Sequence, residues 1–227
     1  MAAAGPAGRI VVWDAPVRVF HWVLAVLVVF SFVTAKIAGA WLEWHMRSGY
    51  AILALLLFRL AWGVLGSSTA RFSGFVRGPG AAMRHLRDIA AKRHAVQPGH
   101  NPLGGWMVLF MVAVLLTQAI SGLFVDDEIA TQGPLAVKVS NALVGRMTAI
   151  HSFNEWVLVG MVALHVAAIA FYGLALRVNL VGPMWHGTMP ASAGTQAPRI
   201  ASTFLAAVLL AISAGFVYWL VVIFPKA

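Results

Sequence analysis

Five long apolar segments constrain what this chain can fold into more than any other feature of its sequence. Each is close to the roughly 20 residues that an α-helix needs to cross a bilayer, and none contains an interior proline. Asn101 and Pro102 form a favourable start for the third segment, as N-cap and first helical residue. We therefore expect transmembrane helices over residues 17–38, 45–65, 102–125, 152–176 and 201–224.

The composition supports a chain that lies mainly in lipid. Hydrophobic residues make up 61% of the sequence and charged residues 10%, with a mean hydropathy of +0.85. These values are typical of an all-α integral membrane protein and lie outside the range of soluble domains. The chain has no cysteine, which excludes disulfides, thiolate metal sites, iron–sulfur clusters and thioether-linked haem.

The basic residues predict how the helices are oriented. If the five helices alternate in direction, ten Lys and Arg residues lie on the side of the N-terminus and five on the opposite side. The positive-inside rule then places the N-terminus inside, in the cytoplasm, and the C-terminus outside. Six of the ten lie between the second and third segments: Arg71, Arg77, Arg84, Arg87, Lys92 and Arg93.

The same basic loop indicates contact with membrane lipid. Residues 81–94 can form a short helix at the inner membrane surface, with its basic side chains among the lipid headgroups. No aromatic residues are interleaved with these basic residues, so the pattern is not that of a nucleic-acid-binding surface.

Four of the eight histidines lie in or at the ends of the expected helices. His151 and His165 are fourteen residues apart on the fourth helix, a rise of about 21 Å that returns nearly to the same face. By helix direction, His21 lies at the inner level with His165, and His45 lies at the outer level with His151. We expect the remaining histidines to be solvated in inner loops: His85, His94, His100 and His186.

Two imidazoles at each of two levels are the axial ligands that two six-coordinate b-type haems require. Zinc usually takes three or four ligands at one level, whereas each level here offers two. A proton relay would be expected to include an acidic residue within a helix core, and we expect none there. A single intramembrane histidine is often only a hydrogen-bonding residue between helices, but four at matched depths favour haem.

Two further residues fit the haem hypothesis. Arg59 lies fourteen residues after His45, on the same face at the inner level, where a haem propionate would neutralise its charge. Gly49, one turn after His45, leaves room for a flat ring against the backbone. The alternatives are that Arg59 reaches the inner headgroups and that Gly49 serves ordinary helix packing.

Several motifs resemble the bacterial cytochrome b561 family, which includes the b-type cytochrome subunits of nickel–iron hydrogenases. They are "WDAPVRVFHW", "EWHMRSGYAILALLLFRLAWG", "GHNPLGGWMVL", "SGLFVDDE" and "HSFNEWVLVGMVALHV", in order over roughly residues 10–187. The resemblance implies a four-helix transmembrane bundle holding two b haems through His21, His45, His151 and His165. It implies a dihaem domain over residues 1–187 in the bacterial inner membrane. Residues 188–227, a linker and the fifth helix, lie outside it.

The resemblance also implies electron transfer between membrane quinone and a periplasmic redox protein, such as a cytochrome c or a hydrogenase-like subunit. An alternative is a superoxide oxidase that reduces quinone with electrons from superoxide. That reaction favours a positively charged outer funnel, whereas the outer charges balance and include the acidic run 126–128, which suits a basic protein partner. A third possibility is a haem-free membrane scaffold or transporter.

Overall fold

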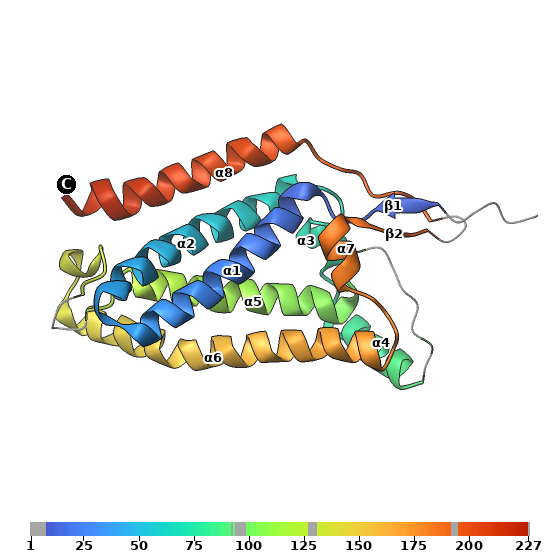
Figure 1. The fold of residues 1–227 in the computed structure, drawn as a ribbon, viewed down its shortest axis with the longest axis horizontal. Helices are drawn as coiled ribbons and strands as arrows, with labels where there is room; N and C mark the ends of the chain where they lie inside the picture. Colours follow the sequence, from blue (N-terminus) through green and yellow to red (C-terminus); the bar gives the residue numbers. More distant parts are fainter. Residues whose placement is uncertain (1–7, 92, 94–98, 127–130, 192–194, 227) are drawn as a thin grey trace, which may run out of the picture.

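The computed structural model describes residues 8–91, 93, 99–126, 131–191 and 195–226. Within these ranges, five helices are long and apolar enough to cross a membrane, and they run lengthwise beside one another (Figure 1). The expectation of an all-α integral membrane protein is thereby confirmed. The helices are α1 (Ala15–Ile37), α2 (Leu42–Leu65), α5 (Pro102–Gly122), α6 (Asn141–Leu174) and α8 (Thr203–Tyr218).

Side-chain caps determine where two of these helices begin. The Asp14 carboxylate accepts a hydrogen bond of 2.7 Å from the backbone N–H of Val17 at the start of α1. The Asn101 side chain accepts one of 2.7 Å from the N–H of Gly104, with Pro102 as the first residue of α5. Each cap satisfies a backbone donor that has no partner within its helix.

Helix α6 begins eleven residues earlier than the apolar pattern predicts, at Asn141 instead of residue 152. Its 34 residues correspond to a length of about 51 Å, which exceeds the hydrocarbon thickness of a bilayer. Hydropathy detects the part of a helix that lies in lipid and does not detect where the helix ends. Helix α8 continues beyond Tyr218 through η3 (Trp219–Ile223) and η4 (Phe224–Lys226), so the fifth segment ends close to the expected residue 224.

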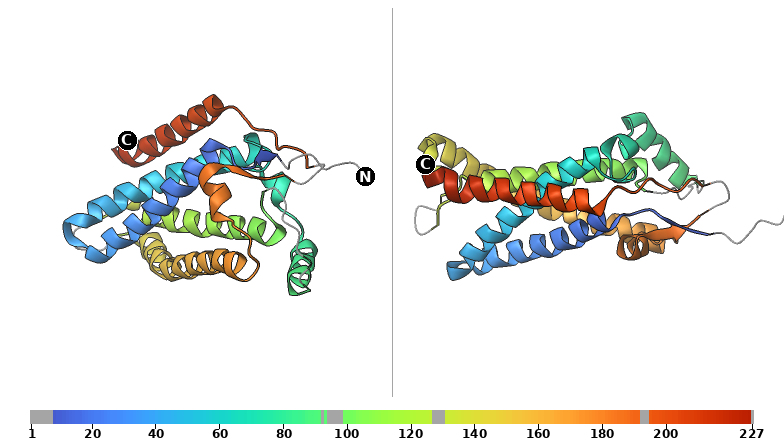
Figure 2. Two further views of the ribbon diagram at one scale, coloured as in Figure 1. Left: turned by 45° about the vertical axis from the view of Figure 1, so that its right-hand side comes forward. Right: turned by 90° about the horizontal axis from the view of Figure 1, so that it is seen from above.

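Helix α2 lies at the centre of the bundle. It packs against α1, α5 and α8, and its side chains Leu56 and Trp62 are fully buried. Among the helices that the structure describes, α6 packs closely only against α5. Helix α8 lies on the side of α2 that faces away from α6 (Figures 1 and 2).

Short elements gather at the end of the bundle where α1 begins. A two-stranded antiparallel sheet joins β1 (Arg9–Val11) to β2 (Thr188–Pro190), with Arg9 opposite Pro190, and α7 (Val181–His186) precedes it. Helices α3 (Phe72–Phe75) and α4 (Pro79–Ala90) lie at this end too, and α4 projects from the bundle (Figure 2). At the other end lie η1 (Gly39–Trp41) and η2 (Ala136–Lys138).

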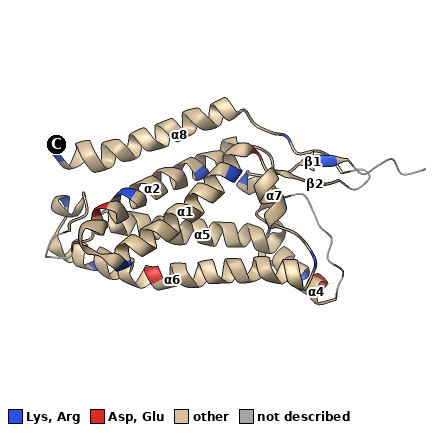
Figure 3. Ribbon diagram, viewed as in Figure 1, with Lys and Arg blue, Asp and Glu red and all other residues tan. Residues whose placement is uncertain are grey.

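Charged residues gather toward the two ends of the long helices (Figure 3). The short helix expected over residues 81–94 corresponds to α4, which exposes the apolar side chains of Met83 and Leu86. We call the end with β1, β2 and α4 the inner end, and the opposite end the outer end, after the topology that the basic residues predict.

Candidate functional site: two histidine pairs at two depths

Two cavities lie between the helices, one toward each end of the bundle. The outer cavity, of about 270 Å³, is lined by residues of α1, α2, α5 and α6, including His45 and His151. The inner cavity, of about 300 Å³, includes His21 and His165 in its walls. Both are near the lower limit for small-molecule sites, about 300–1,000 Å³. Leu115 of α5 belongs to both walls, so the two cavities lie close together on either side of this apolar side chain.

The inner pair bridges α1 and α6. The ring centres of His21 and His165 are 6.3 Å apart, and their planes are inclined at 53°. The Nδ1 atom of His21 is buried and has no hydrogen-bond partner. The structure thus brings together two histidines that are 144 positions apart in the sequence, at the level that helix direction predicts.

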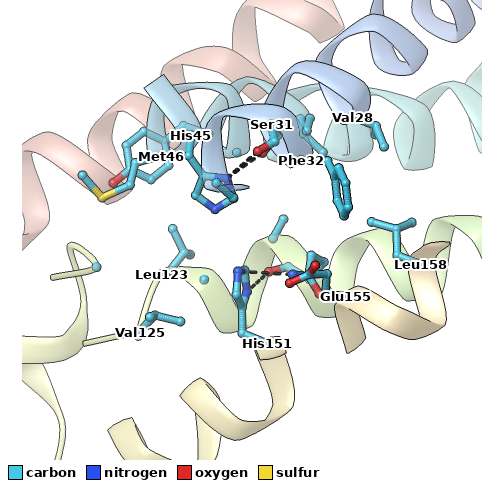
Figure 4. A pocket seen from close by; sticks show the side chains of 18 of the residues that line it. Val28, Ser31, Phe32, His45, Met46, Leu123, Val125, His151, Glu155 and Leu158 are labelled. Atoms are coloured by element: carbon cyan, nitrogen blue, oxygen red, sulfur yellow. Dashed lines mark hydrogen bonds between the residues drawn. The ribbon is translucent and has the colours of Figure 1, made fainter. Parts of the chain in front are cut away.

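The outer pair bridges α2 and α6, and Figure 4 shows the two rings pointing toward one another across the cavity. The ring centres of His45 and His151 are 6.1 Å apart, with planes at 85°. Nδ1 of His45 lies 2.9 Å from the main-chain oxygen of Ser31, and Nδ1 of His151 lies 3.0 Å from that of Gln118. A carbonyl oxygen only accepts, so each Nδ1 donates and each Nε2 keeps its lone pair.

Polar residues of α5 and α6 hold His151 in place. The Asn154 amide donates to the Gln118 side-chain oxygen at 2.8 Å, and the Gln118 amide nitrogen lies 3.2 Å from Nε2 of His151. A metal ion bound at Nε2 would replace this last contact. A Cβ atom on Gly122 would come within 2.9 Å of the His151 ring, so only glycine allows the ring to approach α5 this closely.

The separation of the rings matches one metal ion between each pair. A first-row metal lies about 2.0–2.1 Å from an imidazole nitrogen, and the ring centre lies about 1.1 Å farther, which places two ring centres about 6.3 Å apart. The observed values are 6.3 Å and 6.1 Å. Within the described residues, no group of three or more His, Cys, Asp or Glu side chains could hold a metal. The described residues therefore offer two histidines at each level, and the other ligands of a metal ion held there would have to come from a bound group.

Arg59 of α2 lies in the wall of the inner cavity. It is only 4% exposed, its guanidinium lies 4.8 Å from the ring centre of Phe72, and its Nη1 atom has no hydrogen-bond partner. A buried guanidinium with an unused donor is suited to an anionic group in the cavity. This burial favours a role inside the bundle over an exposed side chain among the lipid headgroups.

Gly49 of α2 lies in the wall of the outer cavity, one turn from His45. A Cβ atom at this position would meet no atom within 4 Å. The missing side chain therefore adds open space to the cavity, and no neighbouring helix fills that space.

Comparison with known proteins identifies the family. The family model described as prokaryotic cytochrome b561 matches residues 12–187. The chain belongs to this family. A relative described as a probable Ni/Fe-hydrogenase B-type cytochrome subunit, from Azotobacter chroococcum mcd 1, is 26% identical over 210 residues, covering 78% of this chain and 86% of the relative. No solved structure matches the chain significantly. This b561-type protein is therefore a multi-pass transmembrane b-type cytochrome of an electron-transfer family.

One histidine of this cytochrome b561 lies where the sequence did not predict it. We expected His100 to be solvated, but its ring packs between Trp13 and Phe75, with ring centres 4.7 Å and 4.5 Å away. It also lines the inner cavity. Burial lowers the pKa of the His100 imidazole to about 3, with smaller contributions from the charges of Arg59 and His21. The expectation failed because both aromatic neighbours are distant in the sequence.

Two other loop histidines that the structure describes, His85 and His186, do not line either cavity. Nε2 of His85 lies 3.0 Å from the hydroxyl of Tyr172, which joins α4 to α6. His186 is exposed, and its Nδ1 atom lies 3.1 Å from the hydroxyl of Thr188. His94, which we also expected to be solvated, lies outside the described residues.

An acidic residue lies in the wall of the outer cavity of this cytochrome b561, although we expected none within a helix core. Glu155 of α6 lines the cavity one turn after His151 and forms an ion pair of 2.5 Å with Lys36 of α1. Figure 4 shows Glu155 beside His151. The expectation was wrong because α6 begins eleven residues earlier than predicted, which places Glu155 well inside the helix and not in its first turn.

The acidic run at the outer end of the b561 chain is described only at its first residue. Asp126 accepts a hydrogen bond of 2.7 Å from the side chain of Gln132. Asp127 and Glu128, the other two acidic residues of this run, lie outside the described residues.

Proposed function

We propose that this protein is a dihaem b-type cytochrome that carries electrons across a bacterial inner membrane. It would connect the quinone pool with a periplasmic redox protein, such as a cytochrome c or a hydrogenase-like subunit. The observation that carries the proposal is the presence of two facing histidine pairs, one toward each end of the bundle, with ring centres 6.3 Å and 6.1 Å apart.

The four histidines would each have one task. His21 and His165 would hold the inner haem, and His45 and His151 the outer haem. Haem b, when bound, supplies reversible one-electron transfer at its iron. The main-chain oxygens of Ser31 and Gln118 keep Nε2 of the outer histidines available, because each accepts the Nδ1 proton.

Other residues would complete the two sites. Arg59 would neutralise a propionate of the inner haem, because its guanidinium is buried, faces the inner cavity and retains an unused donor. Gly49 would leave space for the face of the outer haem. Along α6, His151 and His165 are separated by a rise of about 21 Å, which sets the two sites at different depths.

The charge of the outer cavity favours electron transfer over superoxide oxidation. Among the described residues, the wall of this cavity has no Lys or Arg side chain and includes the carboxylate of Glu155. A wall without a cation does not attract an anionic substrate such as superoxide. The relative described as a hydrogenase cytochrome subunit supports the same reading.

We also propose a dihaem domain over residues 1–187, consistent with the family match to residues 12–187, followed by a separate segment over 188–227.

The haem content of purified protein tests the proposal. We expect two haems per chain by pyridine haemochrome analysis, both low-spin. His21→Ala or His165→Ala should remove the inner haem and leave the outer one, whereas His45→Ala or His151→Ala should have the opposite effect. His186→Ala is the control, because this exposed histidine lies outside both cavities, and it should keep two haems.

Three results would contradict the proposal. One haem per chain in the wild type would mean that one pair has no haem. A preparation without a Soret band, from cells supplied with haem, would favour a scaffold or a transporter instead. Rapid reduction of the bound haem by superoxide, with no exchange with reduced cytochrome c, would favour the superoxide oxidase.

A further inference from the structure

The two cavities are faced by charges of opposite sign. Arg59 lines the inner cavity and Glu155 lines the outer cavity. The partner of each charge lies outside the wall of its cavity. Lys36, which pairs with Glu155 at 2.5 Å, is about half exposed, with 51% of its side chain accessible, against 25% for Glu155. The nearest protein charge to a group bound in the inner cavity would therefore be that of Arg59, and in the outer cavity that of Glu155.

Asp14, the acid whose charge acts on Arg59, is engaged elsewhere. Its carboxylate accepts hydrogen bonds from the Val17 N–H at 2.7 Å and from the Trp62 indole at 3.1 Å. It is 3% exposed and does not belong to the inner cavity wall. The inner cavity wall thus includes the guanidinium of Arg59 and not the carboxylate of Asp14.

The histidines of the two pairs also differ in their hydrogen bonds. Both outer histidines donate Nδ1–H to a main-chain oxygen, that of Ser31 at 2.9 Å and that of Gln118 at 3.0 Å. At the inner pair, Nδ1 of His21 is buried without a partner. Donation of this proton makes an imidazole a stronger electron donor to a bound metal.

Both differences act on redox potential in the same direction. Reduction lowers the charge of a site by one unit, so a nearby cation favours the reduced form and a nearby anion favours the oxidised form. A more basic axial ligand also favours the oxidised form. These interactions are strong where the protein excludes water, as it does around a side chain that is 4% exposed.

We propose that the outer haem site has a lower reduction potential than the inner one, with Glu155 and Arg59 setting the difference. The proposal rests on the dihaem function above. Transfer of one electron from the outer to the inner site, which oxidises the first and reduces the second, is then downhill. The protein favours flow from a reduced periplasmic partner toward an electron acceptor at the inner end.

A potentiometric titration of purified protein tests the proposal. The α-band absorbance should show two steps, and the single-haem variants His21→Ala and His45→Ala assign each step to its site. Glu155→Gln removes the carboxylate with little change in shape, and the outer step should move to higher potential while the inner step stays in place. Lys36→Gln leaves the carboxylate unneutralised and should move the outer step to lower potential.

A matched pair of controls separates this effect from general changes of surface charge. Glu43 and Arg47 form an exposed ion pair on α2 at the same end of the molecule, and neither belongs to the outer cavity wall. Glu43→Gln and Arg47→Gln should leave both steps unchanged. Arg59→Gln should move the inner step to lower potential. Arg59→Lys, which retains the positive charge, should bring the inner step most of the way back to its wild-type potential.

The outcomes distinguish this proposal from the proposed function. A stoichiometry of one haem overturns the function itself. Two haems with an outer potential equal to or above the inner one overturn the inference and leave the function in place. The same holds if Glu155→Gln and Lys36→Gln leave the outer step in place or move it in the same direction.

Discussion

At the scale of single residues, His100 depends most on the surrounding fold. It precedes α5 by two residues, in a segment with the polar appearance of a loop, yet its ring is held between Trp13 and Phe75. Its Nδ1 atom is buried without a hydrogen-bond partner. The imidazole is therefore neutral in the folded protein, with a pKa of about 3 against an ordinary value of 6.5.

This lowered pKa predicts that acid destabilises the fold through His100. The unfolded chain takes up the proton first, so stability is complete above pH 6.5 and is lost progressively as the pH falls toward 3. At pH 5 the cost is about 2 kcal/mol, from about 1.4 kcal/mol per pH unit. Thermal unfolding in detergent at pH 7.5 and pH 5 should show a smaller drop in Tm for His100→Gln than for wild type. His186→Gln, at an exposed histidine, should keep the wild-type drop; equal drops in all three proteins would contradict the prediction.

At the scale of elements, a clasp made by β1, α7 and β2 closes the inner cavity. The N–H groups of Val12 and Trp13 both donate to the main-chain oxygen of Gly187, at 2.8 Å and 3.1 Å. Arg18 of α1 donates to the main-chain oxygen of Trp185 at 2.6 Å. Val12, Trp13 and Met189 line the cavity, so the clasp forms part of the inner site.

Gly187 should be the most sensitive position in this clasp. It has a φ of +85°, and an added Cβ would lie 2.9 Å from the main-chain oxygen of Trp13. We expect Gly187→Ala to cost about 1–3 kcal/mol locally and to speed loss of the inner haem, with the outer haem retained. Gly215→Ala on α8, where a Cβ meets nothing within 4 Å, is the matched control. Haem content against time after dilution into haem-free detergent measures the effect, and equal loss from both variants would show that the clasp does not hold the inner site.

At the scale of the whole molecule, the five candidate spans in the described residues predict that the two ends of the chain lie on opposite sides of the bilayer, because successive spans alternate in direction. The basic residues of α4 and its flanking segments then lie on the same side as β1 (Figure 3). Because basic loops are retained in the cytoplasm, a reporter fused near Arg87 should read cytoplasmic. A reporter fused after Lys226 should read periplasmic. A cytoplasmic signal from both fusions would mean that α8 does not cross the membrane.

Much of the bundle and of the site could be predicted from the sequence because both depend on distances along single helices. Apolar segments of about 20 residues predict spanning helices, and alternation of their direction gives each histidine a depth. Helical geometry then assigns His151 and His165 to two levels of α6 and pairs them with His45 and His21. The spacing from His45 to Arg59 and to Gly49 follows the same rule, and the structure puts both residues in cavity walls.

Only the tertiary structure decided the contacts between segments that are far apart in the chain. Packing of α5 against α6 brings Gln118 and Gly122 to the ring of His151, and pairing of β1 with β2 closes the inner cavity. The start of α6 and the position of Glu155 in the outer cavity wall were decided in the same way. Periodicity and hydropathy report which face of a helix is apolar and how much of it lies in lipid. They do not report which other segment lies against it, because that depends on the packing of the whole bundle.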